Sequence, residues 1–347
     1  MKQRSQTALY ITVFLGLGLL AHETRAQLTL NLTQAENNGF ELADFQHSIE
    51  SATEMDINVI SDNLNIYSEN YNLISLNSAQ ADSACENKKL LDLSGMADLK
   101  PLMRKKNYLY KNRNDCTLSF ASYSLVIAYP LINMMTRRPA SPADFFDVER
   151  FPGMRALPDS HIGPLEWALL AYDIPINEVY QLLSTKRGLK LAFAKLESIK
   201  RYIIWWNSVD ELKQLISDNK VTMATGPHTV FYDLQFNHPM EILWNGQLLV
   251  EMKMGINAAS LKIEDSKLLL AKLMTDSPQF KLAYEYGVGP TNKQTLKTLE
   301  LLPQAGQLLV FIPTHKNNLA KAIWMDYAWH NTLDHIINPQ FKQWRNQ

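Results

Sequence analysis

The segment from residue 144 to residue 173 constrains the fold most strongly, because a turn, a short apolar piece and the start of a helix follow one another there. Pro152 and Gly153 predict a turn, and the apolar residues 156–157 that follow predict a brief strand. Pro164 then stands where a helix would take its first residue. A strand followed by a helix is the repeating unit of an α/β fold.

The same alternation of elements extends to other parts of the chain. Alternating apolar residues predict a first strand, and longer periodic runs predict helices. The expected strands are 28–32, 57–60, 71–76, 116–129, 221–225 and 248–257, and the expected helices are 40–53, 163–171, 176–184, 189–200, 211–216 and 262–275. Strands that alternate with helices favour parallel sheets with crossover helices.

The first 26 residues differ in character from the rest of the chain. Lys2 and Arg4 precede an uncharged, mostly apolar run over residues 8–21, and the small Ala26 follows at the spacing of a cleavage site. We interpret residues 1–26 as a secretory signal peptide. The alternative is a membrane anchor, but this apolar run is short for a hydrocarbon core about 30 Å thick.

The chain has two cysteines, Cys85 and Cys116. In an exported protein an even pair of cysteines is a candidate disulfide. Two unrelated buried thiols are the alternative that the residues alone leave open.

Composition and motifs exclude several classes of function. The 347 residues are 46% hydrophobic and 20% charged, as in a soluble globular protein of about two domains. The net charge of -1 argues against a nucleic-acid binder, which needs a basic face. We find no nucleophile elbow, phosphate-binding loop, dinucleotide fingerprint or zinc-protease motif. An enzyme is therefore not expected, and neither is a cofactor.

Two histidine pairings could suggest chemistry. His330 and Asp334 would share a helix face, with His335 beside them, but zinc needs at least three converging ligands. We therefore expect a surface helix pair rather than a metal site. Ser124 with His161 or His228 could be imagined as nucleophile and base, but no sequence signature predicts that they meet.

Several motifs taken in order resemble the spermidine/putrescine-type solute-binding proteins of bacterial ABC importers. They are Phe-Pro-Gly-x-Arg-Ala-Leu at 151–157, Leu-Glu-Trp-Ala-Leu at 165–169, Trp-Trp at 205–206, Trp-x-Gly-Gln around 244–247 and Gly-Pro-Thr-Asn at 289–292. The resemblance covers roughly residues 71–347, with a weaker echo in 27–70. No single motif is specific, but the ordered set is.

The resemblance implies a two-lobed α/β fold of the periplasmic binding protein type II, with lobes joined by crossing strands. It divides the chain after the signal peptide into 27–130 (first part of lobe 1), 131–249 (first part of lobe 2), 250–292 (second part of lobe 1) and 293–347 (second part of lobe 2). It also implies that Cys85 and Cys116 are bonded, because many related proteins have cysteines at both places. One departure is the connection 61–70, which is too short for the helix that relatives carry there.

The resemblance also places candidate ligand-binding residues. Tyr123 and Ser124 fall on the first crossing strand, and Glu251 falls on the second, while His161 and His228 are polar residues nearby. The alternatives are that Tyr123 packs in a core and that both histidines are loop or capping residues.

The carboxylates that bind polyamine ammonium groups in the family are largely absent. Ser160, Gly163 and Met252 stand at their positions, so we expect weak binding of spermidine and putrescine.

The function implied is that of an exported, monomeric solute-binding protein in the periplasm of a Gram-negative bacterium. It would capture a small solute, polyamine-like or another organic molecule, and present it to an ABC permease in the inner membrane. One alternative is a sensor accessory for a membrane receptor. Another is a degenerate binding protein without a transport role.

Overall fold

The computed structural model describes residues 27–33, 41–103, 107–110, 114–134 and 137–347. Within these residues ten strands form one mixed sheet in the order β2-β1-β3-β8-β4-β7-β5-β6, with β10 beside β8 and β9 beside β4. The strands are β1 (Leu28–Leu32), β2 (Ile57–Ile60), β3 (Leu73–Leu76), β4 (Thr117–Pro130), β5 (Arg155–Pro158), β6 (Ile203–Trp206), β7 (Met223–Pro227), β8 (Met240–Ile256), β9 (Gly289–Pro290) and β10 (Ile323–Trp324).

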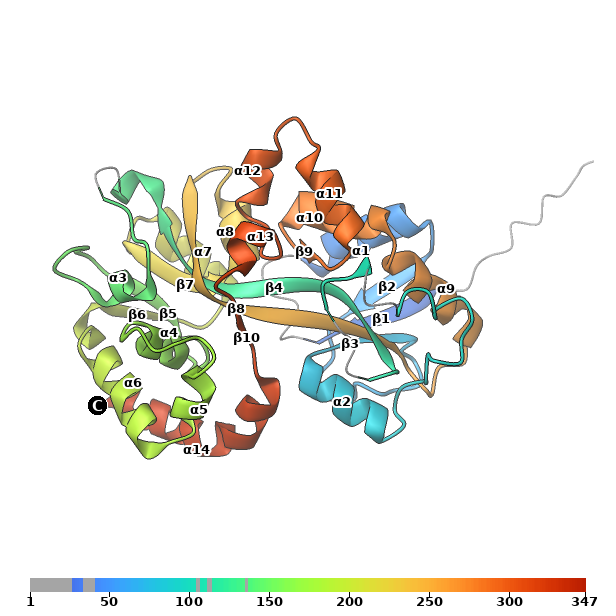
Figure 1. Cartoon of the computed structure of the whole chain (residues 1–347), viewed down its shortest axis with the longest axis horizontal. Coiled ribbons are helices and arrows are strands. Elements are labelled where there is room, and N and C mark those ends of the chain that lie inside the picture. Colours follow the sequence, from blue (N-terminus) through green and yellow to red (C-terminus); the bar gives the residue numbers. More distant parts are fainter. Residues whose placement is uncertain (1–26, 34–40, 104–106, 111–113, 135–136) are drawn as a thin grey trace, which may run out of the picture.

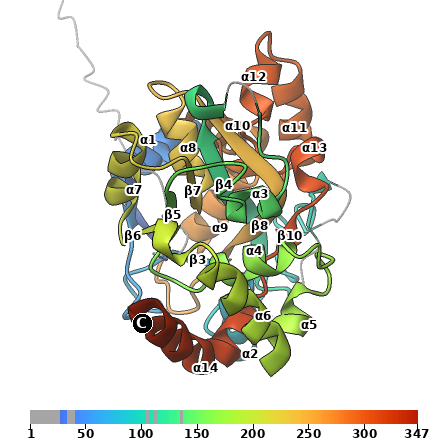
Figure 2. The same ribbon diagram turned by 90° about the vertical axis from the view of Figure 1, so that its left-hand side faces the viewer.

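Helices cover both sides of this sheet, as expected for an α/β fold. They are α1 (Leu42–Thr53), α2 (Ser78–Glu86), α3 (Pro142–Phe146), α4 (Pro164–Leu170), α5 (Val179–Leu183), α6 (Lys186–Glu197), α7 (Val209–Ser217), α8 (His228–Leu234), α9 (Ile263–Leu273), α10 (Asp276–Tyr286), α11 (Lys293–Glu300), α12 (Ala305–Leu309), α13 (Lys316–Leu319) and α14 (Tyr327–Asn346). Figures 1 and 2 both place α2, α5 and α14 on one side and α1, α8, α11 and α12 on the other.

Two long strands hold the two halves of the molecule together. β4 and β8 run antiparallel through the centre and pair along most of their length, from Thr117 opposite Gly255 to Pro130 opposite Met240 (Figure 1). β8 then pairs with β3 in the first half, and β4 pairs with β7 in the second. The crossing strands are therefore as predicted, but the second one begins at Met240 rather than near 248.

The first half is built on three parallel strands. β1 lies between β2 and β3, α1 packs on α9 and α10, and α2 follows β3. No helix lies within residues 61–72, so β2 returns to β3 through turns alone, as the short connection predicts. Cys85 at the end of α2 is bonded to Cys116 just before β4, which confirms the predicted disulfide. The helix thereby becomes attached to a crossing strand.

The second half contains the turn that Pro152 and Gly153 predict. Gly153 has φ 118°, and a Cβ there would lie 1.9 Å from Oγ1 of Thr222. The buried Arg155 donates hydrogen bonds to the carbonyl oxygens of Phe145, Phe151 and Gly153 at 2.6 to 2.8 Å. The Phe-Pro-Gly-x-Arg motif is thus a structural unit in which the guanidinium group satisfies the carbonyls of the turn before β5.

The C-terminal helix completes the core of the second half. Phe341 of α14 is fully buried and packs edge to face on Trp205 of β6, at 5.7 Å between ring centroids. Trp206 donates its indole N–H to the carbonyl oxygen of Thr225 on β7. Both tryptophans therefore pack in the second half. No helix among the described residues is both long enough and apolar enough to cross a membrane.

Candidate ligand-binding site

A cavity of about 250 Å³ opens between the two halves, over the crossing strand β8. One wall is the start of α2 from the first half, and the opposite wall is α5 together with the start of α14. The floor is β8 and β10. The lining residues are Ser78, Ala79, Asp82, Tyr180, Leu249, Glu251, Trp324, Met325, Asp326, Tyr327 and Ala328. Figure 1 shows α2 and α14 facing each other across this gap.

Three carboxylates line the cavity, and each already has a partner. Asp82 accepts a hydrogen bond of 2.7 Å from the side-chain amide of Asn114. Glu251 accepts a bond from Ser119 and lies 3.2 Å from Nζ of the buried Lys253. Asp326 caps α14 by accepting from the N–H of Trp329 at 2.9 Å. These groups can bind one ammonium group, because each carboxylate has further lone pairs free to accept.

The first residues of two helices also line the cavity. Ser78 and Ala79 begin α2, and Tyr327 and Ala328 begin α14. The first N–H groups of a helix have no partner inside the helix, and the helix dipole makes this end favourable for negative charge. The cavity therefore combines carboxylates with two helix starts that suit an anionic group.

Aromatic rings supply the remaining walls. Tyr180 packs against Trp329 at 5.1 Å between ring centroids, and its hydroxyl lies 3.5 Å from Sδ of Met325. Trp324 meets the ring of Tyr110 edge to face at 4.9 Å. Burial, reinforced by the charge of Glu166, raises the pKa of Tyr180 well above its usual value. Tyr180 therefore stays a neutral hydrogen-bonding group, and the rings can pack on the methylene groups of a solute.

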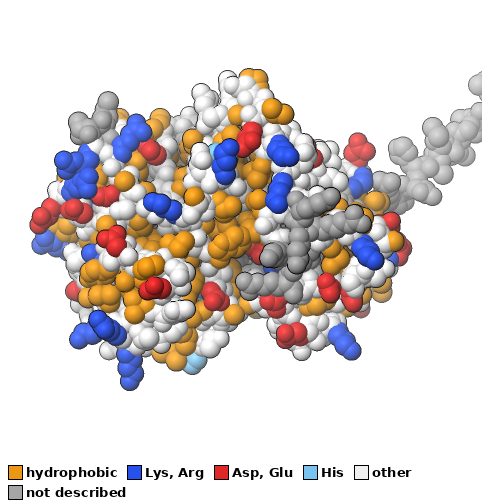
Figure 3. Space-filling model, in the orientation of Figure 1, with side chains coloured by type: hydrophobic (Ala, Val, Ile, Leu, Met, Phe, Trp, Pro, Cys, Tyr) orange, Lys and Arg blue, Asp and Glu red, His pale blue; other side chains and the backbone are white. Residues whose placement is uncertain are grey.

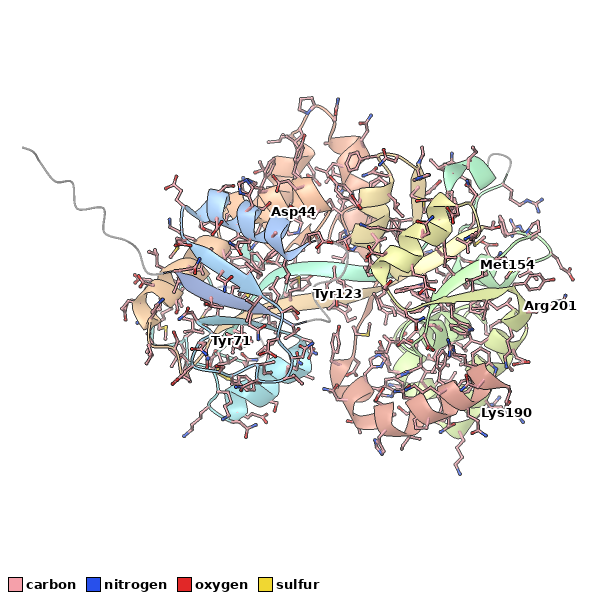
Figure 4. All side chains as sticks on the ribbon, turned by 180° about the vertical axis from the view of Figure 1, so that it is seen from behind. Asp44, Tyr71, Tyr123, Met154, Lys190 and Arg201 are labelled. Carbon is pink, nitrogen blue, oxygen red and sulfur yellow. A yellow bond between two sulfur atoms is a disulfide. The ribbon has the colours of Figure 1, made fainter. Side chains whose placement is uncertain are left out.

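Among the predicted ligand-binding residues, Glu251 lines this cavity and the other four lie elsewhere. Tyr123 is 4% exposed and lies opposite Val250 in the β4–β8 pairing. Figure 4 shows it at the centre of the molecule, between the half with Asp44 and Tyr71 and the half with Met154 and Lys190. Ser124 is fully buried and donates its hydroxyl to Gln247 at 2.6 Å.

His228 is fully buried and connects three parts of the chain. Its Nδ1 accepts from the N–H of Ser124 at 3.0 Å, and its Nε2 donates to the carbonyl oxygen of Gly287 at 2.9 Å. Both ring nitrogens are satisfied only when the imidazole is neutral. Burial lowers the pKa of His228 to about 4, which agrees with this hydrogen bonding.

Met252, Gly163 and Ser160, which stand where the polyamine-binding family has acids, each have their own surroundings. Met252 is buried with Val250 in the main hydrophobic cluster, which joins the two halves. Gly163 caps α4 with φ 95°, and a Cβ there would lie 2.7 Å from the ring of Trp167. Ser160 is half-buried and accepts from the N–H of Ile162. Of these three residues, none lines the cavity.

The expectation that His330 and Asp334 form a pair on the helix surface was wrong. His330 is 4% exposed, and its Nε2 lies 3.1 Å from Oε1 of the buried Glu166 on α4. Asp334 instead lies 3.7 Å from Nε2 of His161, which is itself buried. The helical spacing predicted the shared side of α14 but not its burial against α4. Among the described residues no group of three or more His, Cys, Asp or Glu side chains could hold a metal ion.

A second opening lies between the halves on the other side of the sheet, between α1 and the helices α7 and α8. Its volume is about 580 Å³, and acidic side chains predominate among its polar groups. On the face seen in Figure 3, hydrophobic side chains gather across the middle of the molecule, over the region where the halves meet. Both openings follow the line along which the two halves meet.

A family model decides how this arrangement is classified. The model of the bacterial extracellular solute-binding protein family matches residues 63–301, more than half of the chain. The chain belongs to this family. The family consists of solute-binding proteins, which agrees with the prediction that the chain is not an enzyme.

Similar proteins of known name or structure support the same classification. The chain is 30% identical over 226 residues to a gamma-aminobutyric acid-binding protein of Pseudomonas aeruginosa, covering 62% of this chain and 61% of that relative. The chain therefore matches less than two thirds of that relative's length.

Solved structures show the fold. The structure of the binding protein MotA from A. tumefaciens B6 in complex with glucopine has a TM-score of 0.72 at 20% identity, covering 92% of this chain and all of that one. The spermidine/putrescine substrate-binding protein PotD from Streptococcus pneumoniae has a TM-score of 0.69 at 13% identity, covering 92% and 99%. The predicted resemblance to solute-binding proteins and the two-lobed fold are confirmed.

Sequence reasoning missed most of the cavity residues. Asp82, Tyr180 and Asp326 lie far apart in the chain and meet only because α2, α5 and α14 face one another. One signal was available for Asp326, since an aspartate directly before a periodic helix is a typical N-cap.

Proposed function

We propose that this solute-binding protein is exported, captures a small organic solute in the cavity between its lobes, and presents it to an ABC permease. The observation that carries this proposal is the cavity of about 250 Å³ whose walls come from both lobes and whose floor is a crossing strand. A solute held by both walls stabilises the closed arrangement, because only that arrangement offers both sets of contacts.

The proposed lobes follow the packing of the elements. Lobe 1 takes residues 27–130 and 250–292, because α9 and α10 pack on α1. Lobe 2 takes residues 131–249 and 293–347, because α14 closes the core around Trp205. Within this arrangement Glu251 contacts the solute directly. Tyr123, Ser124, His161 and His228 act on the cavity indirectly, through the crossing strand and the helices of lobe 2.

The chemistry of the cavity favours a solute with both an ammonium and a carboxylate group. The carboxylates of Asp82, Glu251 and Asp326 suit one ammonium group. The starts of α2 and α14 suit an anionic group and disfavour a second cation. A relative that binds gamma-aminobutyric acid, a four-carbon molecule with these two groups, supports this class of solute.

We further propose that the mature chain begins at Gln27 and works as a monomer in the periplasm of a Gram-negative bacterium. Residues 1–26 lie outside the described part of the structure, so this rests on their sequence pattern. N-terminal sequencing of the protein from a periplasmic fraction should give Gln27 as the first residue. Recovery of the full-length chain from the inner membrane would instead identify an anchor.

Calorimetry on a matched pair of solutes tests the ligand class. Gamma-aminobutyric acid and putrescine both have four carbons, but putrescine carries a second ammonium group in place of the carboxylate. We expect residues 27–347, freed of bound solute, to bind gamma-aminobutyric acid at least about tenfold more tightly than putrescine, a difference of about 1.4 kcal/mol. Submicromolar binding of putrescine or spermidine with weaker binding of the amino acid would overturn this class.

A thermal-shift screen extends the test to unrelated solutes. A ligand that binds only the folded protein raises the unfolding midpoint, so amino acids, opine-like compounds, polyamines and small peptides can be compared. A shift with an amino acid or an opine-like compound supports the proposal. No shift with any of the four classes would indicate a binding protein that has lost its transport role.

A further inference from the structure

A buried pair of titratable side chains joins the C-terminal helix to α4 close to the cavity. Nε2 of His330 on α14 lies 3.1 Å from Oε1 of Glu166 on α4, and the two side chains are 4% and 1% exposed. Oε2 of Glu166 also accepts from the N–H of Gly163 at 2.9 Å. A pair buried to this degree contributes to structure only while both partners are present, since removal of one leaves a buried charge unpaired.

Other titratable groups surround the pair on each element packed against it. His161, before α4, has its ring 5.9 Å from that of His330, and Asp334 on α14 lies beyond it. Tyr180 on α5 meets His330 edge to face at 5.7 Å. Burial alone would raise the pKa of Glu166, but the adjacent imidazole of His330 and the N–H of Gly163 lower that pKa below the usual value. Glu166 is therefore ionised at neutral pH.

The pair lies directly behind the residues of α14 that line the cavity. The N–H of His330 donates to the carbonyl oxygen of Asp326 at 3.0 Å, so the two residues close the first turn of the helix. Asp326, Tyr327 and Ala328 are the cavity residues of this turn. Tyr180 forms a second connection, because its ring contacts His330 and also lines the cavity.

The two ends of α14 are held by different interactions. Toward its C-terminus, Phe341 and Trp344 pack on Trp205, and Arg345 forms an ion pair with Asp159 at 3.0 Å. At the first turns, His330 is the most deeply buried side chain, and beside it Trp329 packs on Tyr180 and donates its indole N–H to Oγ of Ser184 at 2.8 Å. The pair with Glu166 is therefore one of the contacts that hold the start of α14, whereas the C-terminal half is held by contacts of its own.

We propose that Glu166 and His330 are positioning residues that hold the first turn of α14 against the cavity. Neither side chain contacts the solute. They act through Asp326, Tyr327 and Ala328, whose placement sets the affinity for the solute. This consequence for binding rests on the proposed function, whereas the placement of the first turn does not.

Hydrogen exchange of residues 27–347 without added solute tests the placement. In His330→Phe, which removes the imidazole but keeps a ring, we expect exchange of the amides 330–333, which bond to the carbonyls of the first turn, to rise at least about tenfold. Exchange over 340–346 should stay unchanged. His330→Gln keeps an N–H that can reach Glu166 and should restore part of the protection. His335→Phe, at an exposed position of the same helix, is the matched control and should change neither region.

His330→Phe could fail to fold because it leaves the buried carboxylate of Glu166 without its partner. A double variant keeps the test decisive in that case. In Glu166→Gln with His330→Phe no charge is buried, so this double variant should fold. We expect its first turn to exchange no faster than that of either single variant, because all three lack the same interaction. Unchanged first-turn exchange in folded His330→Phe and in the double variant, or an equal rise along the whole helix, would overturn the proposal.

Binding is measured separately, with gamma-aminobutyric acid as the probe. If the wild-type protein binds this solute, His330→Phe should lower the affinity at least about tenfold. His330→Gln should recover part of this loss. If wild type does not bind this probe, the ligand class is wrong, but the exchange result still decides whether the pair positions α14. Faster first-turn exchange with unchanged affinity would show that the turn does not set affinity and would contradict that part of the proposal.

Discussion

Nδ1 of His228 accepts a hydrogen bond from the backbone N–H of Ser124, 3.0 Å away on the crossing strand β4. The same ring donates to Gly287 at the end of α10, so one imidazole on α8 contacts both the crossing strand β4 and the end of α10. A proton on Nδ1 would place two N–H groups against each other. The neutral ring is therefore part of the folded arrangement where the lobes meet.

This hydrogen bonding predicts a loss of stability in acid. The pKa of His228 is about 4 in the folded protein and about 6.5 in the unfolded chain, so the unfolded chain binds the proton more readily between these values. We expect this group alone to lower the free energy of unfolding by up to about 3 kcal/mol as the pH falls from 6.5 to 4. Urea denaturation at several pH values measures it.

The control for this prediction is a second histidine. His228→Gln should be less stable than wild type at pH 7 but should show a shallower decline in acid. His47→Gln, at an exposed position, should keep the wild-type decline. Equal pH dependence in all three proteins would show that His228 does not titrate as its burial requires.

The exposed carboxylate at the start of α14 should affect binding more than stability. Asparagine also caps helices well, so Asp326→Asn keeps the cap and removes the charge. We expect a loss of about five- to tenfold in affinity for an amine-bearing solute, with little change in the unfolding midpoint. Asp173→Asn, a surface change in the same lobe, should leave the calorimetric affinity at the wild-type value. Equal affinities of all three proteins would remove Asp326 from the site.

The disulfide should stabilise lobe 1 substantially. Cys85 and Cys116 are 31 residues apart in the chain, and closing a loop of this length contributes about 3 to 4 kcal/mol in the chain-entropy model. The double variant Cys85→Ser with Cys116→Ser should lose about that much in urea denaturation. Mass spectrometry of the unreduced mature protein should show it two hydrogens lighter than the reduced form. Two freely alkylated thiols in a native periplasmic extract would contradict the pairing.

Arg155 should be among the most sensitive positions in lobe 2. Its three hydrogen bonds go to backbone carbonyls of α3 and of the turn before β5. Arg155→Met keeps much of the side-chain volume but leaves these carbonyls unsatisfied, so we expect a loss of roughly 3 to 5 kcal/mol in urea denaturation. Arg187→Met, on the exposed side of α6, should cost less than about 0.5 kcal/mol.

The sequence predicted the local elements well because their causes are local. Serine is a typical residue before the first turn of a helix, and Ser208 accepts from the N–H of Glu211 at the start of α7. The run of apolar residues in β4 predicted a strand buried on both sides, and thirteen of its fourteen positions are buried. Both results depend only on residues a few positions apart.

The cavity was harder to predict because it depends on which helices face each other. Asp82 and Asp326 line the same cavity only because α2 and α14 face each other across β8. The burial of His330 likewise depends on α4, whose Glu166 is more than 160 positions earlier in the chain. Ser160, Gly163 and Met252 stand where the polyamine-binding family has acids. Their identity did not predict that other carboxylates line the cavity.

The position of Phe341 in lobe 2 also bears on how the protein is made. Trp205 belongs to a strand in the middle of the chain, yet its partner ring lies on the final helix. A nascent chain therefore cannot close this core while α14 is still being synthesised, and non-local contacts of this kind form late. The core of the second half therefore stays open around Trp205 until this helix has been made.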